Sequence, residues 1–309
     1  MTKQSIKTEA NIKRNVYSQY GEDWIIRELL ARLEKAGVQL HRWACEFGAW
    51  DGLHLSNTAR LIREEGFRAV LIEGDARRVE LLKRNFPSPD VLKVCSFVTP
   101  RGATSLDQIL PSTAIPLNFD FLSIDIDGQD YYILHYLNSY KPKLICIEFN
   151  PTIPNEIQFV QEDDPKIKQG SSAKAIMGLG ELKGYVAVAA THCNLFLLSK
   201  EYASRIGGNW PSIDELVPHG KEGQFIFSGY DGTILSNKPT IELGWHGSFP
   251  LEQIQILPKL IRKYSEDYNR LESLTFRLWD FLIRPAKLMR ARRKAYAILG
   301  YKPKASARD

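Results

Sequence analysis

The chain has 309 residues, of which 44% are hydrophobic and 25% are charged, and its formal net charge is +5. Such a composition is ordinary for a globular protein, and the length allows one large domain with additions. No apolar run reaches the roughly 18 residues that a membrane span needs. Residues 1–14 are polar and rich in lysine, without the apolar stretch of a secretory signal. We therefore expect a soluble, cytoplasmic protein.

Strands alternate with helices in the first two thirds of the chain, as judged from apolar periodicity and turn residues. Helices are predicted over residues 20–37, 56–65, 77–85, 105–110, 130–137 and 173–182, and strands over residues 43–47, 69–73, 91–97, 119–125, 144–149, 185–190 and 195–199. This alternation predicts an α/β fold with a doubly wound, mostly parallel sheet. The last two strands are joined by residues 191–194 and are expected to form an antiparallel hairpin at one edge.

The alternation stops after residue 200. Residues 207–249 are rich in Gly, Pro, Trp and Tyr and predict an irregular cap beside the substrate. Helix is predicted again over residues 251–298, with breaks at Pro258 and Pro285. We therefore expect a cofactor-binding domain (1–200), a cap (201–250) and a helical, basic extension (251–309). Four aromatic side chains of the cap are suited to stacking on a sugar or planar acceptor: Trp210, Tyr230, Trp245 and His246.

Basic residues are concentrated at the end of the chain. Residues 284–309 carry nine lysines and arginines against one aspartate, a net charge of +8, which leaves −3 for the remainder. Because nucleic-acid sites are typically basic faces of folded domains, nucleic acid is an unfavoured partner. The mixed apolar and basic residues from 284 to 299 are typical of a helix packed on the domain or on a partner subunit. They are equally found in helices that bind an anionic membrane surface or an acidic glycan.

The four cysteines each lie in an apolar run and are far apart in the sequence. Their spacing fits no metal-binding pattern, so buried, reduced thiols are expected at all four positions. They are Cys45, Cys95, Cys146 and Cys193.

Acidic residues and glycines end three of the predicted strands, within residues 43–52, 69–75 and 119–128. In open α/β sheets, ligands bind outside the carboxyl ends of the strands, where the strand order reverses. Acidic side chains at that edge can accept hydrogen bonds from ribose hydroxyls, and glycines let the backbone approach a ligand. The pattern therefore predicts a site for a nucleoside-containing cofactor.

The first segment contains Glu46, Gly48, Asp51 and Gly52. Its Gly-x-x-x-Gly spacing differs from the Gly-x-Gly-x-x-Gly of a pyrophosphate-binding loop, which disfavours a dinucleotide-dependent reductase. The carboxylates instead suit S-adenosylmethionine, which carries an ammonium and a sulfonium. Glu73, at the end of the second strand, is placed to accept both hydroxyls of a ribose.

The third segment and the strand after it supply oxygen ligands. Asp125, Asp127, Glu148 and Asn150 are of the types that Mg²⁺ or Mn²⁺ prefers. A metal there would orient an acceptor hydroxyl and lower its pKa. Without a metal, Asp125, Asp127 or nearby His192 would act as the general base. The third interpretation is that these side chains only cap helices and bind the backbone.

Taken together, these segments resemble the FkbM-type S-adenosylmethionine-dependent methyltransferases. The resemblance covers residues 17–199, and its most specific part is the opening Ser-Gln-x-Gly-Glu-Asp of residues 18–23. It also includes Glu46 to Gly52 with Ser-Asn-Thr at 56–58, Leu-Ile-Glu at 71–73, Phe121 to Gly128, and Ile-Glu-Phe-Asn at 147–150. The family usually has Glu-Gly where this chain has Asp127 and Gly128.

What the resemblance implies is a class I methyltransferase (Rossmann-like) fold that methylates oxygen on sugars or natural products. By position, Glu46, Gly48 and Gly52 would line the methionine end of the cofactor and Glu73 would hold the ribose. Gln19 and Glu22 would border the cleft, and we also count Asp51 and Asp125 among the cofactor contacts.

The sequence thus predicts an S-adenosylmethionine-dependent O-methyltransferase that acts on a glycan or small-molecule hydroxyl, with a metal or a side-chain base to assist. The alternative is a non-catalytic, methyltransferase-like domain that binds a nucleoside and docks a partner or an anionic surface through its basic end. A homo-oligomer is compatible with either.

Overall fold

The computed structural model describes residues 15–126, 128–207, 210–218, 224, 226–229, 231–242, 248–255, 257, 259–263 and 268–283. The chain divides into two units, Met1–Lys221 and Glu222–Asp309. The finer predicted division at residues 200 and 250 stays a prediction.

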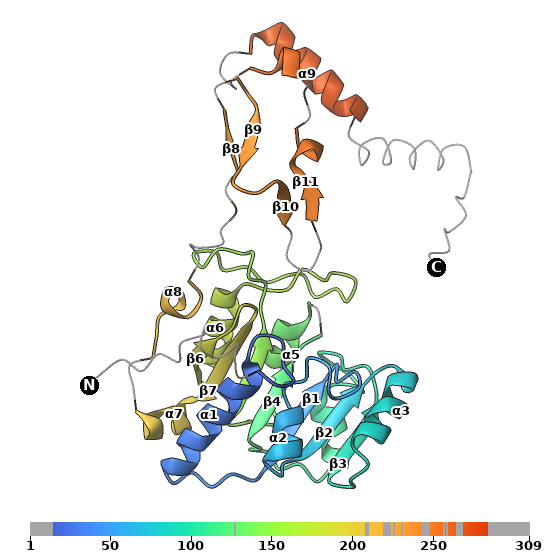
Figure 1. Ribbon diagram of the computed structural model, residues 1–309, viewed down its shortest axis with the longest axis vertical. Coiled ribbons are helices and arrows are strands. Elements are labelled where there is room, and N and C mark those ends of the chain that lie inside the picture. The colour runs from blue at the N-terminus through green and yellow to red at the C-terminus, as the bar shows by residue number, and fades with distance from the viewer. Residues whose placement is uncertain are drawn as a thin grey trace. The chain divides into compact units, whose positions relative to one another are not determined.

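The first unit is built on a seven-stranded sheet in the order β3-β2-β1-β4-β5-β7-β6 (Figure 1). Strands β1 to β5 pair in parallel, and β7 runs antiparallel to both of its neighbours. The strands are β1 Trp43–Phe47, β2 Arg68–Glu73, β3 Val91–Cys95, β4 Phe121–Ile124, β5 Leu144–Glu148, β6 Tyr185–Ala190 and β7 Asn194–Ser199.

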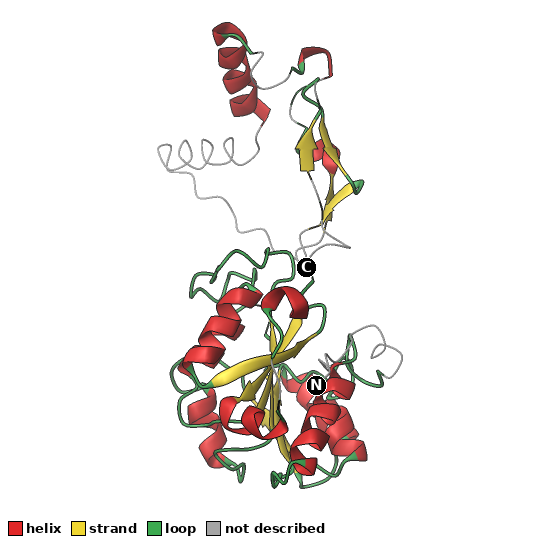
Figure 2. Cartoon of the chain, turned by 90° about the vertical axis from the view of Figure 1, so that its left-hand side faces the viewer, coloured by secondary structure: helices red, strands yellow, loops and turns green. Residues whose placement is uncertain are grey.

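Helices cover both faces of this sheet (Figure 2). They are α1 Glu22–Lys35, α2 Ala59–Glu64, α3 Ala76–Asn85, α4 Leu106–Ile109, α5 Asp130–Tyr136, α6 Ala173–Leu182, α7 Lys200–Ile206 and α8 Ile213–Leu216, with a 3-10 turn η3 at Leu110–Ser112. Successive residues of a strand point to opposite faces. Accordingly, Ala44 of β1 packs in a cluster with α1 and α7, whereas Cys45 packs in a second cluster with α4, α5 and α6.

The strand order confirms the predicted fold class. Strands of four to six residues that are apolar on both faces and alternate with helices are typical of a parallel sheet whose two faces are covered by those helices. The predicted hairpin at the edge is confirmed as β6 and β7, and β7 lies between β5 and the edge strand β6. This is the arrangement of class I methyltransferases. The strand order reverses between β1 and β4, so a ligand site is expected at the carboxyl ends of these two strands.

Two short helices, α7 and α8, follow the sheet where no regular structure was predicted.

The predicted burial of all four cysteines is wrong at one position. Cys95 is exposed because it ends the edge strand β3, whereas Cys45, Cys146 and Cys193 are buried free thiols.

The second unit contains more regular structure than the predicted irregular cap. Strands β8 (Ile226–Ser228) and β9 (Ile234–Ser236) form one antiparallel pair, and β10 (Thr240–Glu242) and β11 (Ser248–Pro250) form another. The predicted turn at residues 229–232 joins β8 to β9, where the Gly229 amide donates to the Thr233 carbonyl at 2.7 Å.

The helix predicted from residue 251 begins later than expected. Among the described residues from 251 to 269, the regular structure consists of the single 3-10 turns η5 (Leu251–Gln253) and η6 (Lys259–Ile261), and the helix α9 (Arg270–Ile283) follows. A proline at 258 lacks an amide donor and clashes with the carbonyl four residues before it, which disfavours an α-helix through residues 254–258. Residues 284–309, with Pro285 and the basic stretch, lie outside the described residues. None of the described helices has the length and hydropathy that crossing a membrane requires.

Candidate functional site

The loops after β1 and β4 touch at the point where the strand order reverses. Gly48, directly after β1, has a φ of +68°, and a Cβ atom built on it would lie 2.7 Å from the backbone carbonyl oxygen of Asp125. Any other residue would therefore be strained and would push the two loops apart. This close approach brings the predicted acidic residues of the two loops to one edge of the sheet.

Glu46 fixes the course of the loop between β1 and α2. Its buried carboxylate accepts hydrogen bonds from Ser56 Oγ at 2.7 Å, Thr58 Oγ1 at 2.5 Å and the Asn57 amide at 2.8 Å. The Asn57 side chain then donates to Ser123 Oγ on β4 at 3.0 Å. Burial raises the pKa of Glu46, and the hydrogen bonds from Thr58 and Ser56 only partly oppose this. Glu46 thus shapes the loop, and its direct contact with a cofactor stays a prediction.

Asp51 and Gly52 are also explained by the packing of this loop. Asp51 Oδ1 accepts from the amides of Leu53 at 2.9 Å and His54 at 2.8 Å. Burial alone would raise the pKa of Asp51, but these backbone hydrogen bonds outweigh it and lower the pKa. A Cβ atom on Gly52 would lie 2.5 Å from the Phe86 ring of the α3 C-cap. Glycine is therefore required here for packing.

Glu73 is oriented by two backbone amides at the end of β2. Its Oε2 accepts from the Trp50 amide at 2.8 Å and its Oε1 accepts from the Asp75 amide at 2.9 Å. The residue is 5% exposed. Because each carboxylate oxygen can accept two hydrogen bonds, one acceptor position stays open on each oxygen for a pair of hydroxyls.

Two exposed aromatic rings stand beside Glu73, and the sequence pattern did not single them out. Phe97 is 73% exposed, and its ring packs directly on Gly74, where an added Cβ atom would approach it to 2.2 Å. Trp50 is 45% exposed and has a left-handed φ of 48°, and the Arg78 guanidinium lies 4.0 Å from its ring centroid. The sequence predicts a strand that runs to Phe97, but β3 ends at Cys95. Phe97 therefore lies beyond the strand, and its ring is exposed.

Acidic side chains from several separate parts of the chain act on two buried thiols. Burial raises the pKa of Cys193, and Glu148, Glu22 and Asp125 raise it further, in that order. Burial likewise raises the pKa of Cys146, with Glu22 and Asp125 as the next largest causes. Glu22, Asp125 and Glu148 thus all act on the Cys193 thiol, and the side chain of Asp125 is exposed.

One of the four predicted metal ligands already has partners within the chain. Asn150 is buried, and its Oδ1 accepts from both the amide of Thr152 at 2.9 Å and its hydroxyl at 2.5 Å. Both acceptor positions of that oxygen are thus used by the chain itself. Among the described residues no group of three or more His, Cys, Asp and Glu could hold a metal ion. Asp127 lies outside those residues.

The Asp130 carboxylate closes the loop after β4. It accepts from the amides of Ile126 and Gly128, both at 2.9 Å. Gly128 packs against the loop between β5 and α6, where an added Cβ atom would lie 2.8 Å from the Ile167 carbonyl oxygen. These hydrogen bonds account for Asp130, and Asp125 in the same segment is exposed.

The segment before α1 is tied to the turn between β6 and β7. Buried Glu22 accepts from Thr191 Oγ1 at 2.7 Å and from the Tyr20 amide at 2.7 Å. The Tyr20 and His192 rings lie 5.2 Å apart. These contacts hold the exposed His192 at the carboxyl edge of the sheet. Gln19, which precedes Tyr20 in the sequence, is also exposed.

The four aromatic side chains predicted to stack on an acceptor divide into two groups. Trp210 packs against the hydrophobic cluster of α1 and α7, so it anchors its own segment. Tyr230, Trp245 and His246 lie outside the described residues.

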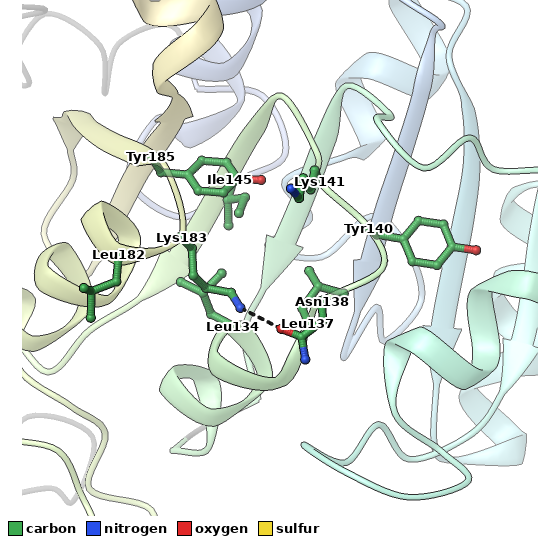
Figure 3. Close-up of a pocket in the computed structure, with 9 residues that line it drawn as sticks. All are labelled: Leu134, Leu137, Asn138, Tyr140, Lys141, Ile145, Leu182, Lys183 and Tyr185. Atoms are coloured by element: carbon green, nitrogen blue, oxygen red, sulfur yellow. Dashed lines mark hydrogen bonds between the residues drawn. The ribbon is translucent and has the colours of Figure 1, made fainter.

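A pocket of about 330 Å³ lies at the other end of the strands (Figure 3). It is lined by the end of α5, the start of β5 and the end of α6, and Lys183 Nζ crosses part of it to Asn138 Oδ1 at 3.3 Å. Because it opens near the amino end of β5, it does not belong to the site at the carboxyl ends.

No protein-family profile matches the chain, and no curated protein matches it either. Several solved structures are similar in fold. An O-methyltransferase from Bacillus cereus in complex with SAH is 18% identical, with a TM-score of 0.36, over 62% of this chain and 98% of that one. A SAM-dependent methyltransferase from Aquifex aeolicus is 11% identical, with a TM-score of 0.32, over 57% of this chain and 96% of that one.

A third similar structure is a candidate sarcosine dimethylglycine methyltransferase from Galdieria sulphuraria. It is 14% identical, with a TM-score of 0.35, over 53% of this chain and 62% of that one, so the match spans less than two thirds of its length. With TM-scores below 0.5, the evidence for the fold is the strand order of the chain itself.

Proposed function

We propose that the chain is an S-adenosylmethionine-dependent O-methyltransferase. The observation that carries the proposal is Glu73, whose carboxylate is held by the Trp50 and Asp75 amides at the end of β2. Its open acceptor positions suit the two hydroxyls of a ribose. The sheet order places this group next to the β1–β4 switch point.

The charge of this edge favours a cationic cofactor over a dinucleotide. Glu22, Asp125 and Glu148 all raise the pKa of Cys193, and carboxylates around that thiol would attract the ammonium and sulfonium of S-adenosylmethionine. A pyrophosphate would meet the same carboxylates as like charges, which is unfavourable. In this arrangement the methionine end runs past Gly48, with Gln19 at the border of the cleft.

Phe97 is proposed to stack on the adenine, because its exposed ring lies beside the ribose-binding Glu73. Stacking of this kind contributes about 0.5–1.5 kcal/mol beyond the buried area. The variant Phe97→Ala is expected to bind S-adenosylhomocysteine about three- to tenfold more weakly, as measured by equilibrium dialysis. Phe97→Trp should restore the affinity, and Leu117→Ala, a truncation of another exposed apolar side chain, should leave it unchanged. Full affinity in Phe97→Ala would remove Phe97 from the site.

The chemistry requires little beyond orientation and the removal of one proton. The acceptor oxygen forms a bond to the methyl carbon as the bond from that carbon to sulfur breaks, and S-adenosylhomocysteine leaves. Holding the two reactants in line lowers the barrier by about 7–11 kcal/mol. We assign the hydroxyl proton to the exposed carboxylate of Asp125, with Asp127 and His192 as the other candidates. The acceptor is proposed to be a hydroxyl of a sugar, a glycan or a natural product.

Cofactor binding is expected to be independent of metal. The oxygen of Asn150 is occupied by Thr152, so this residue is not free to complete a cation site. Bound S-adenosylmethionine should raise the melting temperature equally in the presence of Mg²⁺ and of EDTA, as measured by a thermal shift assay. A stabilisation that appears only with Mg²⁺ or Mn²⁺ would instead support the predicted metal-assisted mechanism.

The cytoplasmic location stays a prediction.

A further inference from the structure

Helix α9 has a well-defined beginning. Asn269 and Glu272 cap it reciprocally: the Glu272 amide donates to Asn269 Oδ1 at 2.9 Å, and the Asn269 amide donates to Glu272 Oε2 at 3.1 Å. Lys263 Nζ, just after η6, pairs with Glu272 Oε1 at 2.6 Å. This pattern is a capping box, which stabilises the first turn. The helix therefore stands as a defined element from Arg270 to Ile283.

One face of α9 is a row of exposed leucines, which we call the leucine face. Its members are between 54% and 76% exposed: Leu271, Leu274, Leu278 and Leu282. At 3.6 residues per turn they lie within an arc of roughly 80°. Glu272, Ser273 and Arg277 occupy other positions around the helix.

Such a row is unusual on a surface exposed to water. Single exposed leucines need no explanation, but contiguous apolar surface marks a site of interaction. The short helix η6 carries one more exposed leucine, Leu260, which is 99% exposed. The ion pair between Lys263 and Glu272 connects the chain just after η6 to the first turn of α9.

The sequence that directly follows α9 indicates the partner. Residues 284–309 carry nine basic residues and one acidic residue. An apolar helix face next to a cluster of lysines and arginines is suited to the interface of an anionic bilayer, where leucines enter the acyl boundary and basic side chains meet the headgroups.

We propose that the leucine face of α9 docks on an anionic lipid bilayer, whose charge complements that of the nine basic residues that follow in the sequence. A second copy of the chain fits less well. The described part of α9 has 14 residues, or two heptads, whereas a coiled coil is sustained over three or four. Two parallel copies would also bring their basic ends together, whereas anionic lipid neutralises them. The proposal does not depend on the methyltransferase activity.

The test is co-sedimentation of the full chain with vesicles of phosphatidylcholine, with and without phosphatidylserine. The wild type should bind the vesicles that contain phosphatidylserine, and less well in high salt. The double variant Leu274→Ser/Leu278→Ser should lower the partition coefficient about tenfold or more, because it removes two side chains from the apolar face.

The matched control is Leu117→Ser/Leu182→Ser, which changes two exposed leucines of the first unit and should bind as the wild type does. Circular dichroism of both double variants verifies that they fold. Equal binding by Leu274→Ser/Leu278→Ser and the wild type would overturn the proposal, as would a wild type that does not bind. A dimer that is lost in Leu274→Ser/Leu278→Ser, without any vesicle binding, would also overturn it and assign the leucine face to a second copy.

Discussion

Replacing Glu73 with alanine is expected to weaken the binding of S-adenosylhomocysteine by at least about tenfold while the fold survives. The carboxylate would accept two ribose hydroxyls, and each hydrogen bond to a charged group contributes about 1.5–3 kcal/mol. A tenfold change corresponds to about 1.4 kcal/mol, so the expected loss is a lower bound. Because Trp50 lies beside Glu73, quenching of tryptophan fluorescence on titration is a suitable measurement.

The control for this variant is Glu80→Ala. Glu80 lies on the surface of α3, where it pairs with Lys83 at 2.7 Å, and the same change of residue type there should leave the affinity unaltered. Glu73→Gln keeps the shape of the side chain and should lose affinity as well, since the amide nitrogen cannot accept a hydroxyl hydrogen. Unchanged affinity in both Glu73 variants would show that the ribose is held elsewhere.

Asp125→Asn is expected to lower methyl transfer by at least about a hundredfold without abolishing the binding of the cofactor. A positioned general base typically contributes 10²–10⁴-fold, and the amide that replaces it cannot take the proton. The backbone carbonyl of Asp125, which packs against Gly48, is unchanged by the substitution, so the loop geometry should survive. The measurement is the transfer of labelled methyl to the hydroxyl compound that the wild type methylates best.

His192→Gln and Asp127→Asn are the comparison variants, since these residues are the other candidates for the base. Asp90→Asn, at an exposed aspartate near the amino end of β3, is the matched control and should keep full activity. If Asp125→Asn retained full activity and His192→Gln lost it, the proton would be assigned to His192.

The sheet could be predicted from the sequence because its signals are local. Runs such as residues 69–73 and 144–149 are apolar on both faces, and turns end them within one or two residues of the observed limits. The position of Glu73 could be predicted as well. The last residue of a parallel strand lies at the carboxyl edge of the sheet, whatever the place of that strand in the strand order.

The roles within the site depended on tertiary contacts that the sequence does not show. Nothing local indicates that Gly52 is required by the Phe86 ring. The use of the Asn150 oxygen by Thr152, in contrast, is a contact two residues along the chain, of a kind that asparagine often makes. The exposure of Phe97 could not be predicted either, because an apolar residue after a strand is usually buried. The second unit was predicted least well, since its strands of three residues are too short to show a period of two.

The most direct test of the account is a calorimetric titration of the full chain with S-adenosylhomocysteine. The account predicts micromolar binding at a single site, displaced by S-adenosylmethionine. An absence of binding would contradict the assignment of the β1–β4 edge as a cofactor site and would favour the alternative of a non-catalytic domain. The leucine face would then be the part of the chain to study, because the vesicle experiment tests it independently of any cofactor.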